Sequence, residues 1–239
     1  MRTRIECIRL LYAKVYICME KYINGLEKQQ DFQRLVMVIY HVLDEVFRNG
    51  SQVAVLRSLL DTSSGYTGNE VARLSGIHPL SALKALTVLE QLGIINRQRG
   101  GRDHIFTLNR NHYMVQRVIV PLYQAEKDLF KEITKTIASV LKRSVLNATI
   151  FGSVAKRAET PLSDFDLCCI VKTESQKELA RNLLNSNSRK LHQTFGIKVA
   201  PMFFTLREMK AKSKTPLIRD IVAHGLNIAG KEVKVLLHD

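Results

Sequence analysis

The sequence lacks the features expected of a membrane protein or a disulfide-stabilised secreted protein. No run of about 18 apolar residues without charge occurs among its 239 residues, so no membrane span is expected. Near the N-terminus, Glu6, Arg9 and Lys14 interrupt any signal-peptide core. The four cysteines form no C-x-x-C pair, and the seven histidines show no metal-ligand spacing. We therefore interpret the cysteines as reduced core residues of a cytoplasmic protein.

Acidic residues are scarce relative to basic ones. The chain has 22 Asp and Glu residues against 36 Lys and Arg residues, which gives a formal net charge of +14. The basic excess is spread along the whole chain and does not form a tail. This distribution favours a polyanionic partner, such as nucleic acid or nucleotide phosphates. No internal repeat or low-complexity tract is present.

The hydrophobic pattern predicts an α+β protein of two domains. We expect a helical N-terminal extension over 1–48, with its helices broken near Asn24-Gly25, and a first domain over 49–113. A long amphipathic helix should then link the domains over 114–146. The second domain, 147–239, alternates short apolar strands with helices, which indicates a small mixed sheet.

The end of the N-terminal extension is strongly apolar. A helix there would carry Leu35, Val36, Val38, Ile39, Val42, Leu43 and Val46. Such a helix is suited to pairing, either with the chain's own first domain or with a second copy, so we expect a homodimer. The pattern changes at Met37, and residues 1–36 are expected to be dispensable for folding.

The first domain shows the order helix, helix, helix, hairpin over 52–108. Thr67 and Glu70 form a capping box at the start of the second helix. Pro79 suits the first position of the third helix. The stretch around Gly100-Gly101 alternates polar and apolar residues and predicts a hairpin with a basic tip.

The stretch "YTGNEVARLSGIHPLSALKALTVLEQLGIINRQRGGRDHIFTLN" resembles the winged helix-turn-helix of bacterial and archaeal transcription regulators. The resemblance implies that the third helix enters the DNA major groove while the hairpin, or wing, touches the backbone. The expected DNA contacts are Ser81, Lys84 and Thr87 on the helix, and Arg97, Arg99 and Arg102 on the wing. The outward-facing Leu80 and Leu83 leave open a second interpretation, a protein-interaction module.

The second domain begins with the stretch "FGSVAKRAETPLSDFDLCCIV". Gly152-Ser153 lies where a strand should turn into a helix, and ten residues separate it from Asp164 and Asp166. The two aspartates lie two apart on a predicted strand, so both face one side and repel each other unless a cation lies between them. Oxygen ligands and phosphates suit Mg²⁺. A glycine turn with free N–H groups and the Ser153 hydroxyl suits a phosphate.

This stretch resembles the minimal nucleotidyltransferase family within the DNA polymerase beta superfamily, whose motif is Gly-Ser, ten residues and Asp-x-Asp. The tail "TPLIRDIVAHGLNIAGKEV" also resembles the family's closing helix and strand. The resemblance implies that Asp164 and Asp166 bind Mg²⁺ as catalytic ligands and that the turn binds a nucleoside triphosphate, expected to be ATP. The expected nucleotide ligands are Gly152, Ser153, Lys156 and Arg157. Lys156 stands where the family usually has arginine, and Arg157 replaces a usual glycine.

The sequence departs from the family at a third aspartate on a later strand. That position falls at about Ala200, and Glu208 and Asp220 on the following helices are poor substitutes. Three functions therefore remain open. In the first, the protein is a DNA-binding transferase that passes a nucleotide, expected to be AMP, to an unknown acceptor. Alternatively, it is a transcriptional regulator whose transferase domain only senses nucleotide. The third alternative is an antitoxin-like transferase that modifies a partner protein.

Overall fold

The computed structural model describes residues 37–101, 103–141 and 144–238. The chain divides into two compact units, Met1–Pro121 and Leu122–Asp239. The helices expected before residue 37, including the break near Asn24-Gly25, lie outside the described residues. None of the described helices is both long enough and apolar enough to cross a membrane.

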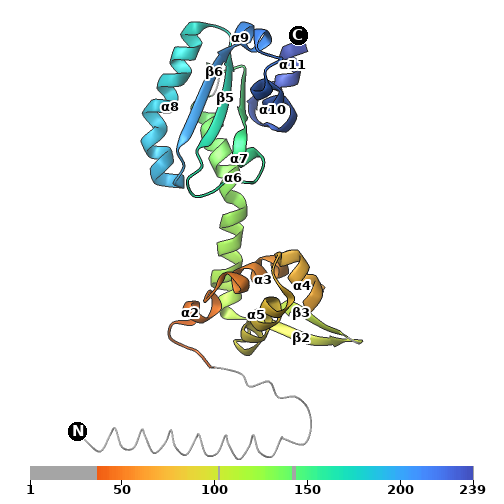
Figure 1. Ribbon diagram of the computed structural model, residues 1–239. Coiled ribbons are helices and arrows are strands. Elements are labelled where there is room, and N and C mark those ends of the chain that lie inside the picture. The colour runs from red at the N-terminus through yellow and green to blue at the C-terminus, as the bar shows by residue number, and fades with distance from the viewer. Residues whose placement is uncertain (1–36, 102, 142–143, 239) are drawn as a thin grey trace, which may run out of the picture. The chain divides into compact units, whose positions relative to one another are not determined.

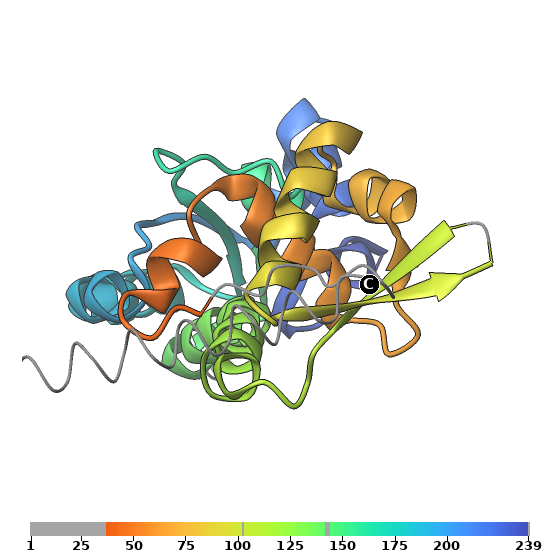
Figure 2. The ribbon, with the colours of Figure 1, turned by 90° about the horizontal axis from the view of Figure 1, so that it is seen from below.

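In the described part of the first unit, the helices α3, α4 and α5 pack together beside a three-stranded antiparallel sheet. Its elements are α2 (Val42–Val46), α3 (Gly50–Leu60), β1 (Tyr66–Thr67), α4 (Gly68–Ser75), α5 (Pro79–Gln91), β2 (Ile95–Gly100), β3 (Asp103–Leu108) and the π-helix η1 (Val115–Ile119). The sheet order is β1-β3-β2. The strands β2 and β3 form a hairpin that projects from the helices of this unit (Figure 1, Figure 2).

The local signals in the first unit lie where the sequence placed them. The Asn49 side chain caps α3, and Thr67 and Glu70 form both hydrogen bonds of a capping box at the start of α4. The α5 helix begins at Pro79. Its apolar residues at helical spacing, Leu86 and Leu89, are fully buried.

The apolar helix expected at the end of the N-terminal extension is wrong over residues 37–41, which are not helical. Helix α2 begins only at Val42, because His41 adopts the left-handed conformation with φ 61° and breaks the helical path. Val46 alone of the described apolar residues expected on this helix is buried, whereas Ile39 is 68% exposed. Helical spacing of apolar residues therefore did not translate here into a buried face.

The second unit is a mixed sheet covered by helices on both faces. Its elements are β4 (Asn147–Ile150), α7 (Gly152–Ala155), β5 (Phe165–Val171), α8 (Glu174–Phe195), β6 (Val199–Thr205), α9 (Leu206–Ala211), α10 (Pro216–His224), β7 (Leu226–Gly230) and α11 (Val233–His238). The sheet order is β6-β5-β4-β7, with β5 and β6 parallel and the other pairs antiparallel. Helix α6 (Val120–Leu141) runs from the end of η1 into this unit.

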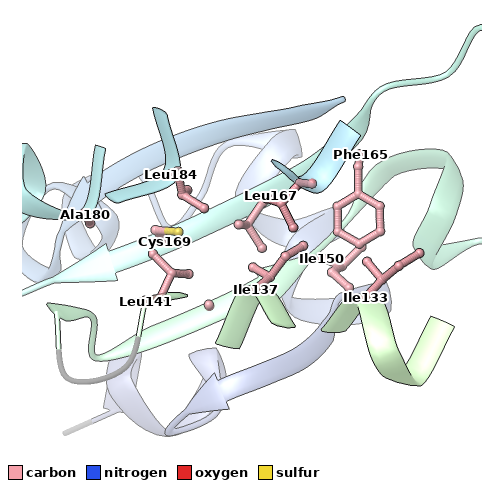
Figure 3. Close-up of a cluster of buried hydrophobic side chains, with 11 residues drawn as sticks. Ile133, Ile137, Leu141, Ile150, Phe165, Leu167, Cys169, Ala180 and Leu184 are labelled. Carbon is pink, nitrogen blue, oxygen red and sulfur yellow. The ribbon is translucent and has the colours of Figure 1, made fainter. Parts of the chain in front are cut away.

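Alternate residues of β5 are buried in two separate cores. Phe165, Leu167 and Cys169 pack with α6 and α8 on one face of the sheet (Figure 3). Cys168 and Ile170 pack on the other face, against α9, α10 and α11 (Figure 1). Asp166 has the parity of the second face, so the sheet itself holds this carboxylate away from the larger core.

Candidate functional site

The Gly152-Ser153 turn lies at the end of β4, against the start of β5. Its strand, Asn147–Ile150, is buried along its whole length. The amide of Phe151 donates a hydrogen bond to the Asp166 carbonyl at 3.1 Å, which ties the turn to β5. Gly152 has φ 71°, in the left-handed region where residues with a Cβ are strained. The sequence therefore placed the turn correctly between the strand and the short helix α7.

Gly152 is also required for space. A Cβ at this position would lie 2.1 Å from Oδ2 of Asp166, far inside van der Waals contact. The carboxylate of Asp166 is thus packed directly against the turn that the sequence assigned to a phosphate. Gly152 and Asp166, which lie 14 residues apart in the sequence, therefore bring the two parts of the predicted site together.

The two aspartates lie at the start of β5. Asp164 immediately precedes the strand, and both side chains are partly exposed while Phe165 between them is buried. Burial, followed by the negative charge of Asp164, raises the pKa of Asp166. A divalent cation between the carboxylates would relieve both effects. The donor set, two carboxylates beside a glycine turn, therefore fits one Mg²⁺ with substrate phosphates as further ligands.

In the described part of the chain, no third carboxylate completes this pair. Within the parallel pairing of β5 and β6, the Cα partner of Asp166 is Ala200, so Ala200 shares its face of the sheet. Among the described residues, no group of three or more His, Cys, Asp or Glu side chains is placed to hold a metal ion. Ala200, the position expected to carry the third acid, therefore lies beside Asp166 on the neighbouring strand, and its side chain is only a methyl group.

The Glu208 carboxylate binds residues at the start of α9 and on α8. It forms a capping box with Thr205 at the start of α9, and Lys177 Nζ lies 2.9 Å from its Oε2. The backbone hydrogen bond from Thr205, followed by the hydrogen bond from Lys177, lowers the pKa of Glu208 to about 2. This carboxylate stabilises a helix end, and it accepts hydrogen bonds from the Thr205 amide and from Lys177.

Lys156 and Asp220 form a contact that sequence reasoning missed. Lys156 Nζ lies 2.8 Å from Oδ1 of Asp220 on α10, and Nδ1 of His224 lies 3.0 Å from the same oxygen. The hydrogen bond from Lys156 is the largest cause of the lowered pKa of Asp220. Asp220 therefore positions the cation that follows the Gly-Ser turn, across a sequence separation of 64 residues.

Lys198 is a second residue that the sequence did not single out. Its Nζ lies 3.1 Å from Oδ1 of Asp164. Lys198 precedes Ala200 by two residues, so the spacing places both on one face of the strand, but only the register of β5 and β6 puts Lys198 beside Asp164.

Arg157 has a backbone conformation that is typical of glycine. Its φ is 53°, in the left-handed region, and its side chain is exposed. The resemblance implied a glycine at this position, and the local conformation is one that glycine adopts without strain. The chain thus retains the glycine geometry of the turn while adding a basic side chain beside it.

The residues predicted to contact DNA lie on α5 and on the hairpin. Lys84 and Thr87 are exposed, Ser81 is partly buried, and the Thr87 hydroxyl donates to the Leu83 carbonyl at 2.9 Å. Leu80 and Leu83 are both about half exposed, at 55% and 53%. Arg97 and Arg99 are exposed on β2, with Arg97 4.0 Å from the Glu90 carboxylate. Arg102 lies outside the described residues.

Comparison with known proteins gives one family match. Residues 131–233 match the model of the family described as "Polymerase beta, Nucleotidyltransferase". The C-terminal part of this chain therefore carries a nucleotidyltransferase domain, and the matched range contains the Gly-Ser turn, both aspartates and Ala200. The segment 52–108, for which a winged helix-turn-helix was predicted, lies outside this range.

One of the solved structures that match the chain is weakly similar to it. It is described as "Crystal structure of the toxin-antitoxin with AMP-PNP", is 14% identical, and covers 45% of this chain and 80% of its own, with a TM-score of 0.30. That score is too low to show a common fold. No curated protein matches the chain.

Proposed function

We propose that the C-terminal domain binds a Mg²⁺–nucleoside triphosphate, ATP in the first instance, and transfers its nucleotide to an acceptor hydroxyl. The observation that carries this proposal is the contact between the Gly152 turn and the Asp166 carboxylate. It brings the glycine turn and the carboxylate pair into one place. The family match over 131–233 supports the same reaction class.

Each group has a distinct role in this proposal. The turn amides and the Ser153 hydroxyl bind the phosphate tail, and Lys156 and Arg157 supply positive charge beside it. Asp164 and Asp166 hold the Mg²⁺, which when bound neutralises charge on the phosphate oxygens. The acceptor oxygen forms a bond to the α-phosphorus, and the bond from that phosphorus to the bridging oxygen breaks. Pyrophosphate leaves with the electron pair, and the acceptor proton passes to water.

Metal-dependent binding tests the site. Asp164→Asn and Asp166→Asn should each abolish Mg²⁺-dependent ATP binding in calorimetry, because each removes a charged ligand. Glu159→Gln, an exposed acid in the loop between the turn and the pair, is the matched control and should bind as wild type. Unchanged Mg²⁺-dependent affinity in both aspartate variants would contradict the assignment.

The alanine at position 200 favours a second candidate for the same domain, a nucleotide sensor with slow or no transfer. Incubation with labelled ATP, Mg²⁺ and cell extract separates the two. A transferase leaves label on an acceptor, with a toxin-like partner protein among the candidates. A sensor binds ATP with the same dependence on Asp166 and leaves no labelled acceptor.

DNA binding by the first unit is a separate proposal. Its support is the exposed arginine pair on a projecting hairpin beside the exposed face of α5. Replacing Arg97, Arg99 and Arg102 with Ala should weaken binding and reduce the salt slope by about 0.9 for each lost phosphate contact. Arg207→Ala, an exposed arginine in the other unit, is the control. A triple variant with the wild-type slope would exclude the wing as the contact and favour the protein-interaction module.

A further inference from the structure

Lys198 is placed beside the aspartate pair by the sheet itself. The amide of Phe165 donates to the Lys198 carbonyl at 2.8 Å, one step before the paired residues Phe165 and Val199. Lys198 and Ala200 therefore lie on the same face of the sheet as Asp164 and Asp166. Lys198 is beside Asp164, and Ala200 is beside Asp166. The ammonium group approaches both oxygens of Asp164, at 3.1 Å and 3.4 Å.

This face of β6 supplies positive charge where a second cation would need negative charge. Phosphoryl and nucleotidyl transfer sites with two metals hold the attacking and leaving oxygens between ions about 3.5–4 Å apart. Two such ions need oxygen ligands and compensating negative charge close to both positions. Here the position beside Asp166 is Ala200, and the position beside Asp164 is a lysine. Relative to a site with an acid at 200 and no lysine, the local charge is more positive by two.

We propose that Lys198 takes the place of a second divalent cation, so that the site binds one metal ion per chain together with the triphosphate. The ammonium group neutralises Asp164 on the β6 side, while the single Mg²⁺ lies between the carboxylates and the phosphates. Lys198 acts through Asp164 and is a positioning residue. This inference rests on the proposed function, because it concerns the metal of the same nucleotide site.

The alternative is an ordinary surface ion pair. Lys198 is 78% exposed, and an exposed pair contributes little to folding. Stability measurements would not separate the two roles, since both predict a small effect. The number of metal ions bound per chain does separate them, because a surface pair has no influence on it.

Equilibrium dialysis with Mn²⁺ and a non-hydrolysable ATP analogue tests the proposal on the full chain. Wild type should hold one Mn²⁺ and one nucleotide per chain. Ala200→Asp with Lys198 retained should still hold one Mn²⁺ per chain, whereas the double variant Lys198→Ala with Ala200→Asp should hold two. Two ions in Ala200→Asp alone would show that Lys198 forms an ordinary surface pair. Lys198→Ala alone should keep one ion and bind it about threefold to tenfold more tightly, because a neighbouring positive charge is removed. Lys210→Ala, an exposed lysine on α9, should match wild type in both number and affinity.

Lys198→Asp is a second variant that tests the proposal if the Ala200→Asp chain does not fold. The exposed position tolerates the change, and the new carboxylate should also allow a second Mn²⁺. Two ions in wild type would overturn the inference, as would a single ion in every folded variant. In both cases the Mn²⁺ that remains is still lost in Asp166→Asn, so the proposed function stands. No nucleotide-dependent Mn²⁺ in any chain would overturn the proposed function and this inference together.

Discussion

At the scale of single residues, this site is defined by positions where only one kind of side chain fits. Gly152 combines a left-handed backbone with a carboxylate 2.1 Å from the place where a Cβ would lie. Arg157 shows the opposite case. It adopts φ 53° in open surroundings, so its conformation costs free energy without any steric obstacle to its side chain.

Replacing Arg157 with Gly should stabilise the second unit in the absence of nucleotide. Relief of the left-handed strain is worth about 1–2 kcal/mol, while the greater freedom of glycine in the unfolded chain takes back about 0.4–1 kcal/mol. We expect a net gain of about 0.5–1 kcal/mol in urea unfolding followed by circular dichroism. Arg157→Ala removes the same charge but keeps the strain, so it should show no gain. Equal gains in both variants would assign the effect to charge.

At the scale of elements, the ends of the short helices are fixed by paired side chains. The capping box of Thr205 and Glu208 at the start of α9 is reinforced by Lys177 from α8. These hydrogen bonds and the lysine charge hold the pKa of Glu208 at about 2, below its usual 4.5. A lowered acid pKa contributes stability above the unfolded value, and this contribution is lost as the pH falls through the folded value.

The stability difference between wild type and Glu208→Gln should therefore depend on pH. Wild type should be the more stable protein at pH 7, and its advantage should shrink steadily as the pH falls from about 5 toward 2. Thermal unfolding across this range measures it. Glu232→Gln, at an exposed glutamate before α11, provides the control and should show a small difference at every pH. A constant difference for Glu208→Gln would mean that its charge is not what holds the helix end.

The elements also show what the sequence was able to predict. The capping box of Thr67 and Glu70, the start of α5 and the Gly-Ser turn are local patterns, and the structure places them as predicted. The contacts of Lys198 with Asp164 and of Lys156 with Asp220 span 34 and 64 residues. They depend on strand register and on the packing of α10, which no spacing in the sequence encodes. The helix expected over 37–41 failed because apolar periodicity does not specify what will cover the apolar face.

At the scale of the whole molecule, each unit has its own core. The cores of the second unit on both faces of its sheet are built from residues of α6 and later elements. The family match also begins within α6, at residue 131. The nucleotide chemistry proposed for this unit therefore draws every side chain from the C-terminal half of the chain.

A fragment beginning at Val120 should fold and bind the Mg²⁺–ATP complex with the affinity of the full chain. The same fragment should lose DNA binding, since the hairpin and α5 are absent from it. Calorimetry with ATP and gel-shift assays with DNA at low salt measure the two activities. Loss of nucleotide binding by a fragment that still unfolds cooperatively would show that the first unit contributes to the site.

Cys168 and Cys169 lie on opposite faces of the sheet, so the reactivity of each thiol measures the opening of a different core. They are neighbours on β5 and fully buried, one in each core, and burial raises the pKa of Cys168 to about 12 and that of Cys169 as well. Alkylation requires an exposed thiolate, so each thiol should react only when the layer above it opens. Alkylation rates, assigned by fragmentation mass spectrometry, should then differ between the adjacent sulfurs. Bound Mg²⁺–ATP should slow Cys168 more than Cys169, because Cys168 shares the face of Asp166.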